Sequence, residues 1–215
     1  MIDDWKHTHN RRWIYRPDKM LTDPFGNRTV RANMHPGYQN PDAIGPSGPV
    51  DPGLTIVSFR ALDGRPIAVL ANYSMHYFGA APVSADYYGL FAERIAKTIG
   101  AEGLDPPFVG ILSQGTSGDQ MWTDYGKPAR QITLDAYADE VALAAKAAHD
   151  GIQHREGLTL AMAEARLTLP RRVPDGARLA WAREVVAKME GRKPASLPEV
   201  YAHEQIYLHE EPVRE

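Results

Sequence analysis

Residues 54–77 read LTIVSFRALDGRPIAVLANYSMHY, and the predicted secondary structure of the chain begins here. The apolar and β-branched residues of 54–59 are typical of a strand, and the apolar run of 66–71 predicts a second, more buried strand. Asp63-Gly64 between them is a typical hairpin signal. The sequence therefore predicts a β-hairpin, whose second strand is followed directly by a polar segment that contains His76.

Predicted helices alternate with strands in the rest of the chain. Apolar residues at helical spacing predict a helix over 88–99, and 108–112 is a short apolar run of buried-strand length. Three more helices are predicted at 129–149, 181–191 and 196–209, with a strand at 158–169. This order predicts an α/β fold with a layered, mixed β-sheet core flanked by helices, incomplete at both ends.

The first quarter of the chain has a different composition. Residues 1–53 are rich in Pro, Gly, Asn and Asp and show almost no periodic apolar pattern. Each proline removes a backbone donor and blocks a helix, so long loops are expected here. We therefore predict one partial domain over 1–215, in which 1–53 is mostly loop and 54–215 forms the α/β core.

Composition excludes several classes of partner and site. The formal net charge of -3 gives no electrostatic reason to expect a nucleic acid. Cysteine is absent, so any transition metal would need His, Asp, Glu or Tyr ligands. No stretch approaches the roughly 18 consecutive apolar residues of a membrane span, so no transmembrane segment is expected. Oligomeric state is left open.

Two polar segments follow predicted strands and contain the residues most suited to chemistry. In α/β sheets, ligands bind beyond the carboxyl ends of strands. In the first segment, His76 is a possible zinc ligand, and Asp86 could orient that ring or activate water. The second segment, 113–120, offers further candidates: Ser117 and Asp119 as catalytic side chains, and Gly115 and Gly118 as a flexible backbone that could stabilise an oxyanion.

The same residues have structural interpretations. A single histidine after a strand is more often a hydrogen-bonded structural residue than a ligand. Asp86 and Asp119 suit helix caps, and 115–118 could form a simple turn that does not match G-x-S-x-G. His7-Thr8-His9 has the spacing of a metal-binding pair, but it lies in a terminus expected to fray. A solvated helix face is expected for His203, Glu204, His209 and Glu210.

These segments resemble the neutral/alkaline ceramidase family. Asn72-Tyr73-Ser74-Met75-His76-Tyr77 resembles the motif in which a strand ends in a zinc-binding histidine, and Ser84-Ala85-Asp86-Tyr87-Tyr88-Gly89 is similar to the family's Ser-Gly-Asp-Asn-x-Gly. Phe108 to Gln114 with Gly118-Asp119 resembles the strand and turn that carry the nucleophilic serine. Asn10 to Trp13 and Gly48 to Pro52 look like connecting segments of the bacterial ceramidase-like branch.

The resemblance implies the N-terminal catalytic domain of a secreted or periplasmic enzyme that cleaves a ceramide-like lipid amide. In the family, two histidines, a glutamate and a tyrosine hold zinc, and His76 matches the second histidine. The other ligands would lie outside this chain, which implies an internal fragment that is inactive alone. Lys6-His7-Thr8-His9 imitates the first-histidine motif but adjoins Asn10, at the wrong place. Met121 stands where the family has its serine, so either the nucleophile would be a metal-bound water, Ser117 or Thr116, or the substrate would not be ceramide.

Three functional hypotheses follow. The preferred one is a zinc-dependent hydrolase of an amide bond, with His76 as a ligand. The second is a metal-independent serine hydrolase, in which Ser117 attacks and His76 is its base. The third is a non-enzymatic binding domain, in which the glycine-rich segments are turns.

Overall fold

A hairpin of two long strands forms the centre of the sheet in the computed structural model, which describes residues 1–211. Strand β6 (Gly53–Arg60) pairs antiparallel with β7 (Pro66–Tyr73). In the turn between them Gly64 has φ 93°, a left-handed conformation that glycine adopts without steric cost. The predicted hairpin is confirmed, and its second strand continues to Tyr73.

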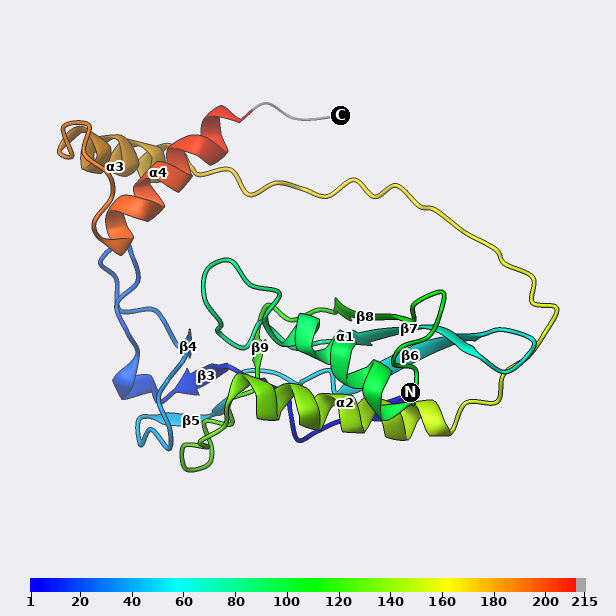
Figure 1. The fold of residues 1–215 in the computed structure, drawn as a ribbon. Coiled ribbons are helices and arrows are strands. Elements are labelled where there is room, and N and C mark those ends of the chain that lie inside the picture. Colours follow the sequence, from blue (N-terminus) through cyan, green and yellow to red (C-terminus); the bar gives the residue numbers. More distant parts are fainter. Residues whose placement is uncertain (212–215) are drawn as a thin grey trace. The chain divides into compact units, whose positions relative to one another are not determined.

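The hairpin extends into a four-stranded mixed sheet of order β1-β6-β7-β8. Strand β1 (Ile2–Asp3) is antiparallel to β6, and β8 (Val109–Gln114) is parallel to β7. Helix α1 (Asp86–Thr98) makes the crossover that a parallel pair requires, and α2 (Leu134–Asp150) packs beside it on the same face of the sheet (Figure 1). The predicted α/β fold with a mixed sheet and flanking helices is confirmed.

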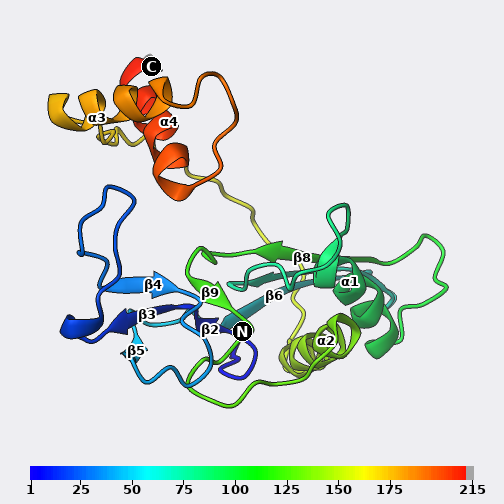
Figure 2. The same cartoon turned by 90° about the vertical axis from the view of Figure 1, so that its left-hand side faces the viewer.

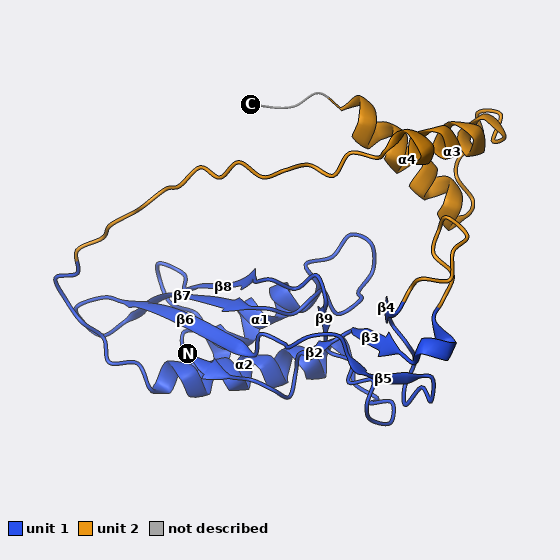
Figure 3. Cartoon of the chain, turned by 180° about the vertical axis from the view of Figure 1, so that it is seen from behind, with its two compact units in different colours: residues 1–20, 31–158 blue, residues 21–30, 159–215 orange. Residues whose placement is uncertain are grey.

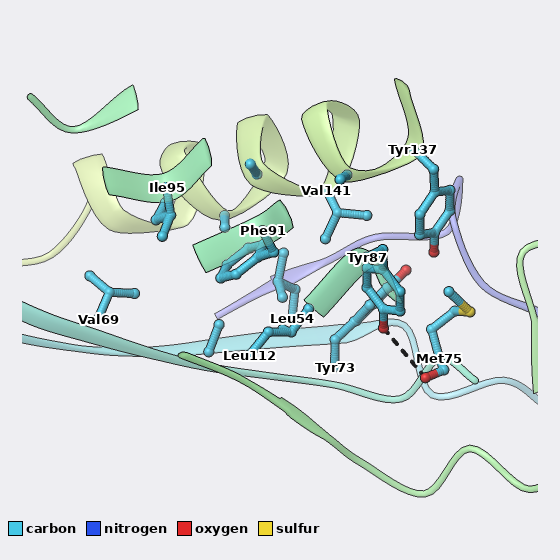
Figure 4. Close-up of a cluster of buried hydrophobic side chains, with 14 residues drawn as sticks. Leu54, Val69, Tyr73, Met75, Tyr87, Phe91, Ile95, Leu112, Tyr137 and Val141 are labelled. Carbon is cyan, nitrogen blue, oxygen red and sulfur yellow. Dashed lines mark hydrogen bonds between the residues drawn. The ribbon is translucent and has the colours of Figure 1, made fainter. Parts of the chain in front are cut away.

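The core lies between this sheet and its two helices (Figure 4). Phe91 and Ile95 of α1 are fully buried. They meet Val69 and Leu112 of the sheet and Val141 of α2 in one cluster. Complete burial of side chains of this size contributes about 1.5–3 kcal/mol each, so this cluster is a large source of stability for the sheet and its two helices.

Helices α1 and α2 begin at other residues than predicted. Helix α2 begins at Leu134 rather than near residue 129, because the Thr133 hydroxyl accepts a hydrogen bond from the Ala136 N–H (3.2 Å) and caps the helix. Helix α1 begins at Asp86, two residues before the predicted start.

Residues 1–53 contain more strand than predicted. Strand β3 lies between β4 and β5 in a three-stranded sheet, and β2 pairs with the distant β9 (Figure 2). A 3-10 turn, η1 (Pro17–Lys19), follows β3. Strands of two to four residues are too short to show alternation, which explains why the sequence did not reveal them. Their bounds are β2 His9–Asn10, β3 Arg12–Tyr15, β4 Ala32–Met34, β5 Ala43–Pro46 and β9 Gln120–Met121.

The strand predicted over 158–169 is wrong. This segment has no secondary structure, and its side chains are exposed. Apolar residues do alternate along it, with Leu158, Leu160 and Met162 all more than 70% exposed. Alternation favours a strand only when a neighbouring strand pairs with the backbone, and here the segment has no strand partner among the described residues.

The chain divides into two units (Figure 3). The elements described so far belong to the first, residues 1–20 and 31–158. In the second, α3 (Gly176–Ala187) packs against α4 (Leu197–Glu210). Both predicted helices are present, but α3 begins five residues and ends four residues before the predicted bounds of 181–191. The ring of Phe25 meets Trp181 edge-on with centroids 4.9 Å apart. The solvated face expected on α4 is also found: exposed there are His203, Glu204, His209 and Glu210.

No helix in the described part of the chain is long and apolar enough to cross a membrane.

Candidate functional site

The two polar segments begin at the same edge of the sheet. Because β7 and β8 are parallel and Tyr73 is paired with Gln114, the residues that follow each strand leave side by side. The Gly115 N–H donates to the Tyr73 carbonyl (2.9 Å). A Cβ at Gly115 would lie 2.3 Å from Ser74 Oγ, so only glycine fits this close approach.

His76 lies just beyond this edge and is half-buried. Its Nδ1 atom is buried and has no hydrogen-bond partner among the described residues. Its ring packs against Tyr77, with centroids 4.2 Å apart. Burial lowers the pKa of His76 and the positive charge of Arg11 lowers it further, and together they outweigh a backbone hydrogen bond at Tyr77 and the charge of Asp86, which raise it. The ring is therefore neutral at neutral pH, the form that binds a metal ion or accepts a proton.

Arg11 ties the second segment to the N-terminal strands. Its Nε and Nη2 donate to the Gly118 carbonyl at 3.2 and 2.7 Å, and its backbone N–H donates to the Asp119 carbonyl at 2.7 Å. His35, whose Nδ1 is 2.6 Å from the Tyr125 hydroxyl, also lowers the pKa of His76. The sequence gives no local signal for Arg11 or His35 as site residues, since pairings between distant strands bring them here.

Asp86 holds the backbone that follows His76. Its carboxylate accepts hydrogen bonds from four backbone N–H groups, at 2.7 to 3.0 Å: those of Phe78, Gly79, Ala80 and Tyr87. Burial opposes ionisation of this carboxyl, but the four hydrogen bonds outweigh it and lower its pKa. Asp86 itself has φ 51°, an unusual backbone conformation for an aspartate. These contacts suit a positioning role better than that of a general base.

The candidate residues of the second segment already form hydrogen bonds with other residues of the chain. Ser117 is buried, and its Oγ accepts from Gln114 Nε2 (2.6 Å). Asp119 Oδ2 accepts from Asn10 Nδ2 (3.2 Å). The Gly115 N–H donates to the Tyr73 carbonyl, and the Gly118 carbonyl accepts from Arg11. The segment is thus well ordered, and the hydrogen bond to Ser117 comes from an amide side chain rather than from His76.

His7, expected in a fraying terminus, is instead buried, which corrects that expectation. Its Nδ1 lies 2.6 Å from Asp4 Oδ2 and its Nε2 lies 2.7 Å from Glu140 Oε2. Burial opposes ionisation of Glu140, but hydrogen bonds from Lys6, Arg130 and His7 outweigh it and lower its pKa to about 2. With both ring nitrogens engaged by carboxylates, His7 fastens the N-terminal segment to α2 and is not available as a metal ligand.

The residues around His76 fit a zinc ion only in part. Zinc sites in proteins use three or four His, Cys, Asp or Glu ligands. Among residues 1–211, no group of three or more such side chains is placed to hold a metal ion. The unpartnered Nδ1 of His76 fits the role of one ligand. A cavity of about 460 Å³ adjoins the segment after His76 and is lined by Tyr77, Ala80, Ala81, Pro82, Ser84 and Asp86.

No family model, curated protein or solved structure matches this chain.

Proposed function

We propose that this chain carries the histidine-bearing part of a zinc-dependent amide hydrolase of the neutral ceramidase type. One observation carries the proposal: the neutral imidazole of His76, with its Nδ1 buried and without a hydrogen-bond partner, lies at the carboxyl edge of a parallel strand pair. A buried polar atom is normally paired, so an unpaired one at such an edge is a reasonable ligand position.

In this proposal His76 supplies one zinc ligand. A bound zinc ion would polarise the amide carbonyl. The described residues around His76 do not complete a ligand set, so no catalytic step is assigned to the metal. These residues have positioning roles. Asp86 holds the backbone of 78–80, which follows His76, and Arg11 holds the turn at Gly118.

The burial of Ser117 supports water over this serine as the nucleophile. Ser117 is 8% exposed and its hydroxyl is held by Gln114. Met121, at the position of the family's serine, has no nucleophilic atom suited to attack a carbonyl. The proposed substrate is a lipid amide of the ceramide class, on the strength of the motif resemblance around His76.

Zinc titration of the ¹⁵N-histidine-labelled chain, followed by NMR of the imidazole nitrogens, tests the proposal. The His76 resonances should shift first, and a His76→Ala variant should lose that response. The matched control is His203→Ala, which removes an exposed histidine of α4. A response that persists unchanged in His76→Ala contradicts the proposal.

A further inference from the structure

A second cluster of reactive side chains lies at the C-terminal end of α2, within the first unit. Ser58 of β6 places its Oγ 3.2 Å from His149 Nε2 and 3.1 Å from His154 Nε2. The two imidazole rings are arranged edge-on, with centroids 6.3 Å apart. A hydroxyl has a single proton, so one ring must accept that proton and the other must donate an N–H to Oγ.

Asp150 indicates which ring is the acceptor. His149 Nδ1 is buried and has no hydrogen-bond partner among the described residues, and Asp150 Oδ1 lies 3.9 Å from it, close enough for electrostatic attraction but too far for a hydrogen bond. A hydrogen bond from Lys146 lowers the pKa of Asp150, so this carboxyl is ionised at neutral pH. A carboxylate favours a proton on the Nδ1 that faces it, which leaves His149 Nε2 as the acceptor towards Ser58.

His154 then takes the donor role. Burial lowers the pKa of His154, and the charge of Arg60 acts in the same direction. A neutral ring has one N–H, and placing it on Nε2 lets His154 donate to Ser58 Oγ while His149 accepts. Ser58 Oγ is thus within hydrogen-bond reach of a base, His149 Nε2, which is what an activated serine nucleophile requires.

A cavity of about 480 Å³ adjoins this cluster and is lined by both Ser58 and His154. Its volume falls in the range of small-ligand pockets, which is about 300–1,000 Å³. Much of the wall is apolar, including Ile56, Phe59, Leu62, Ile67 and Ile152. The cavity therefore suits an apolar group attached to a reactive carbonyl near the serine.

We propose that Ser58, His149 and Asp150 form a second hydrolytic site, which cleaves esters of apolar carboxylic acids without a metal ion. Ser58 Oγ attacks the ester carbonyl carbon while its proton passes to His149 Nε2. The carbon–oxygen bond to the alcohol breaks, and the alcohol leaves with that proton. Water then attacks the acyl-serine ester, His149 accepts a proton from it and returns it to Ser58, and the carboxylic acid is released.

Labelling with a fluorophosphonate and peptide mapping by mass spectrometry test the site, together with hydrolysis of p-nitrophenyl hexanoate by the full chain. We expect the label on Ser58, and both labelling and hydrolysis to fall about 100-fold or more in Ser58→Ala and His149→Gln. The matched control is Ser47→Ala, because this serine lies outside both sites, its backbone N–H donates to the Arg12 carbonyl, and its substitution should leave both readouts unchanged. Circular dichroism melts verify that each variant is folded.

A comparison of kcat with KM separates a base from a structural residue. His149→Gln should lower kcat for p-nitrophenyl hexanoate and leave KM nearly unchanged, because the imidazole would act in the chemical step and not in substrate binding. Labelling of another serine, such as Ser117, would overturn the proposal, as would a complete lack of labelling. Hydrolysis that is abolished by a chelator and restored by zinc would overturn it as well, since it would identify the two histidines as metal ligands.

Discussion

The guanidinium of Arg11 lies 2.7 Å from the carbonyl oxygen of Gly118, and this contact joins the N-terminal strands to the turn that follows β8. It also places a positive charge near His76, whose pKa it lowers. The electrostatic state of His76 thus depends on a residue 65 positions earlier in the chain, which only the folded structure reveals.

Arg11→Met should raise the pKa of His76, because the variant removes a positive charge that disfavours the imidazolium while burial remains. The matched control is Arg12→Met, which removes an exposed arginine from the adjacent position. An NMR pH titration of the histidine ring protons measures both. An unchanged His76 pKa in Arg11→Met would show that Arg11 does not act on this ring.

Gly115→Ala should destabilise the sheet edge, because the added Cβ would lie 2.3 Å from Ser74 Oγ. Overpacking of this kind costs about 1–3 kcal/mol. Gly118→Ala is a stringent control, since a Cβ there would meet no heavy atom within 4 Å. Urea denaturation gives both free energies of unfolding, and equal values for the two variants would contradict the close packing at Gly115.

Asp86→Asn should destabilise the chain by about 2 kcal/mol at pH 7, since the amide cannot accept all four backbone hydrogen bonds. The folded-state pKa of Asp86 lies below its ordinary value of 3.8, so its stabilisation is complete above that value and is lost as pH falls through the folded pKa. The difference in free energy of unfolding between wild type and Asp86→Asn should therefore become smaller at acidic pH.

Denaturation curves at pH 7 and near pH 3 test this pH dependence. Asp63→Asn is the control, because an asparagine can still accept the single hydrogen bond from the Arg65 N–H in that exposed turn. A difference between Asp86→Asn and wild type that is the same at both pH values would argue against an ionised carboxylate as the stabilising group.

Glu140→Gln should cost about 2 kcal/mol at neutral pH, since it weakens the charged hydrogen bonds to His7, Lys6 and Arg130. The pKa of Glu140 is about 2 in the folded chain against 4.5 ordinarily. The stabilisation is therefore present above pH 4.5 and disappears between that value and pH 2. Thermal melts of wild type and Glu140→Gln between pH 2 and pH 7 measure this stabilisation, and the control is Glu102→Gln, which changes an exposed glutamate. If Glu140→Gln lost no more stability than Glu102→Gln, the stabilising role of the Glu140 contacts would be contradicted.

Local sequence patterns predict the central fold well. The hairpin of β6 and β7 and helix α1 depend on alternation, a turn dipeptide and helical spacing within short windows, so they are visible in the sequence. The pairing of β2 with β9 joins residues more than 100 positions apart and leaves no local pattern. The segment 158–169 shows the converse, because it has the pattern of a strand without a partner.

The position of the candidate site at the sheet edge could be predicted from the sequence, but the residues that reach it from distant strands could not. That His76 and the segment 113–120 lie at one sheet edge follows from two predicted strands that end in polar residues. The roles of Arg11 and His35 depend on distant strand pairing and are seen only in three dimensions. The burial of His7 between two carboxylates likewise requires α2 to pack on the N-terminal segment.

The most direct test of the proposed function is the zinc titration of the labelled chain, read at the imidazole nitrogens of all eight histidines. We expect the His76 resonances to move at the lowest zinc concentration, and the remaining histidines to respond later or not at all. Perturbation of other histidines alone, with the His76 resonances unmoved through saturation, would contradict the assignment of His76 as a zinc ligand.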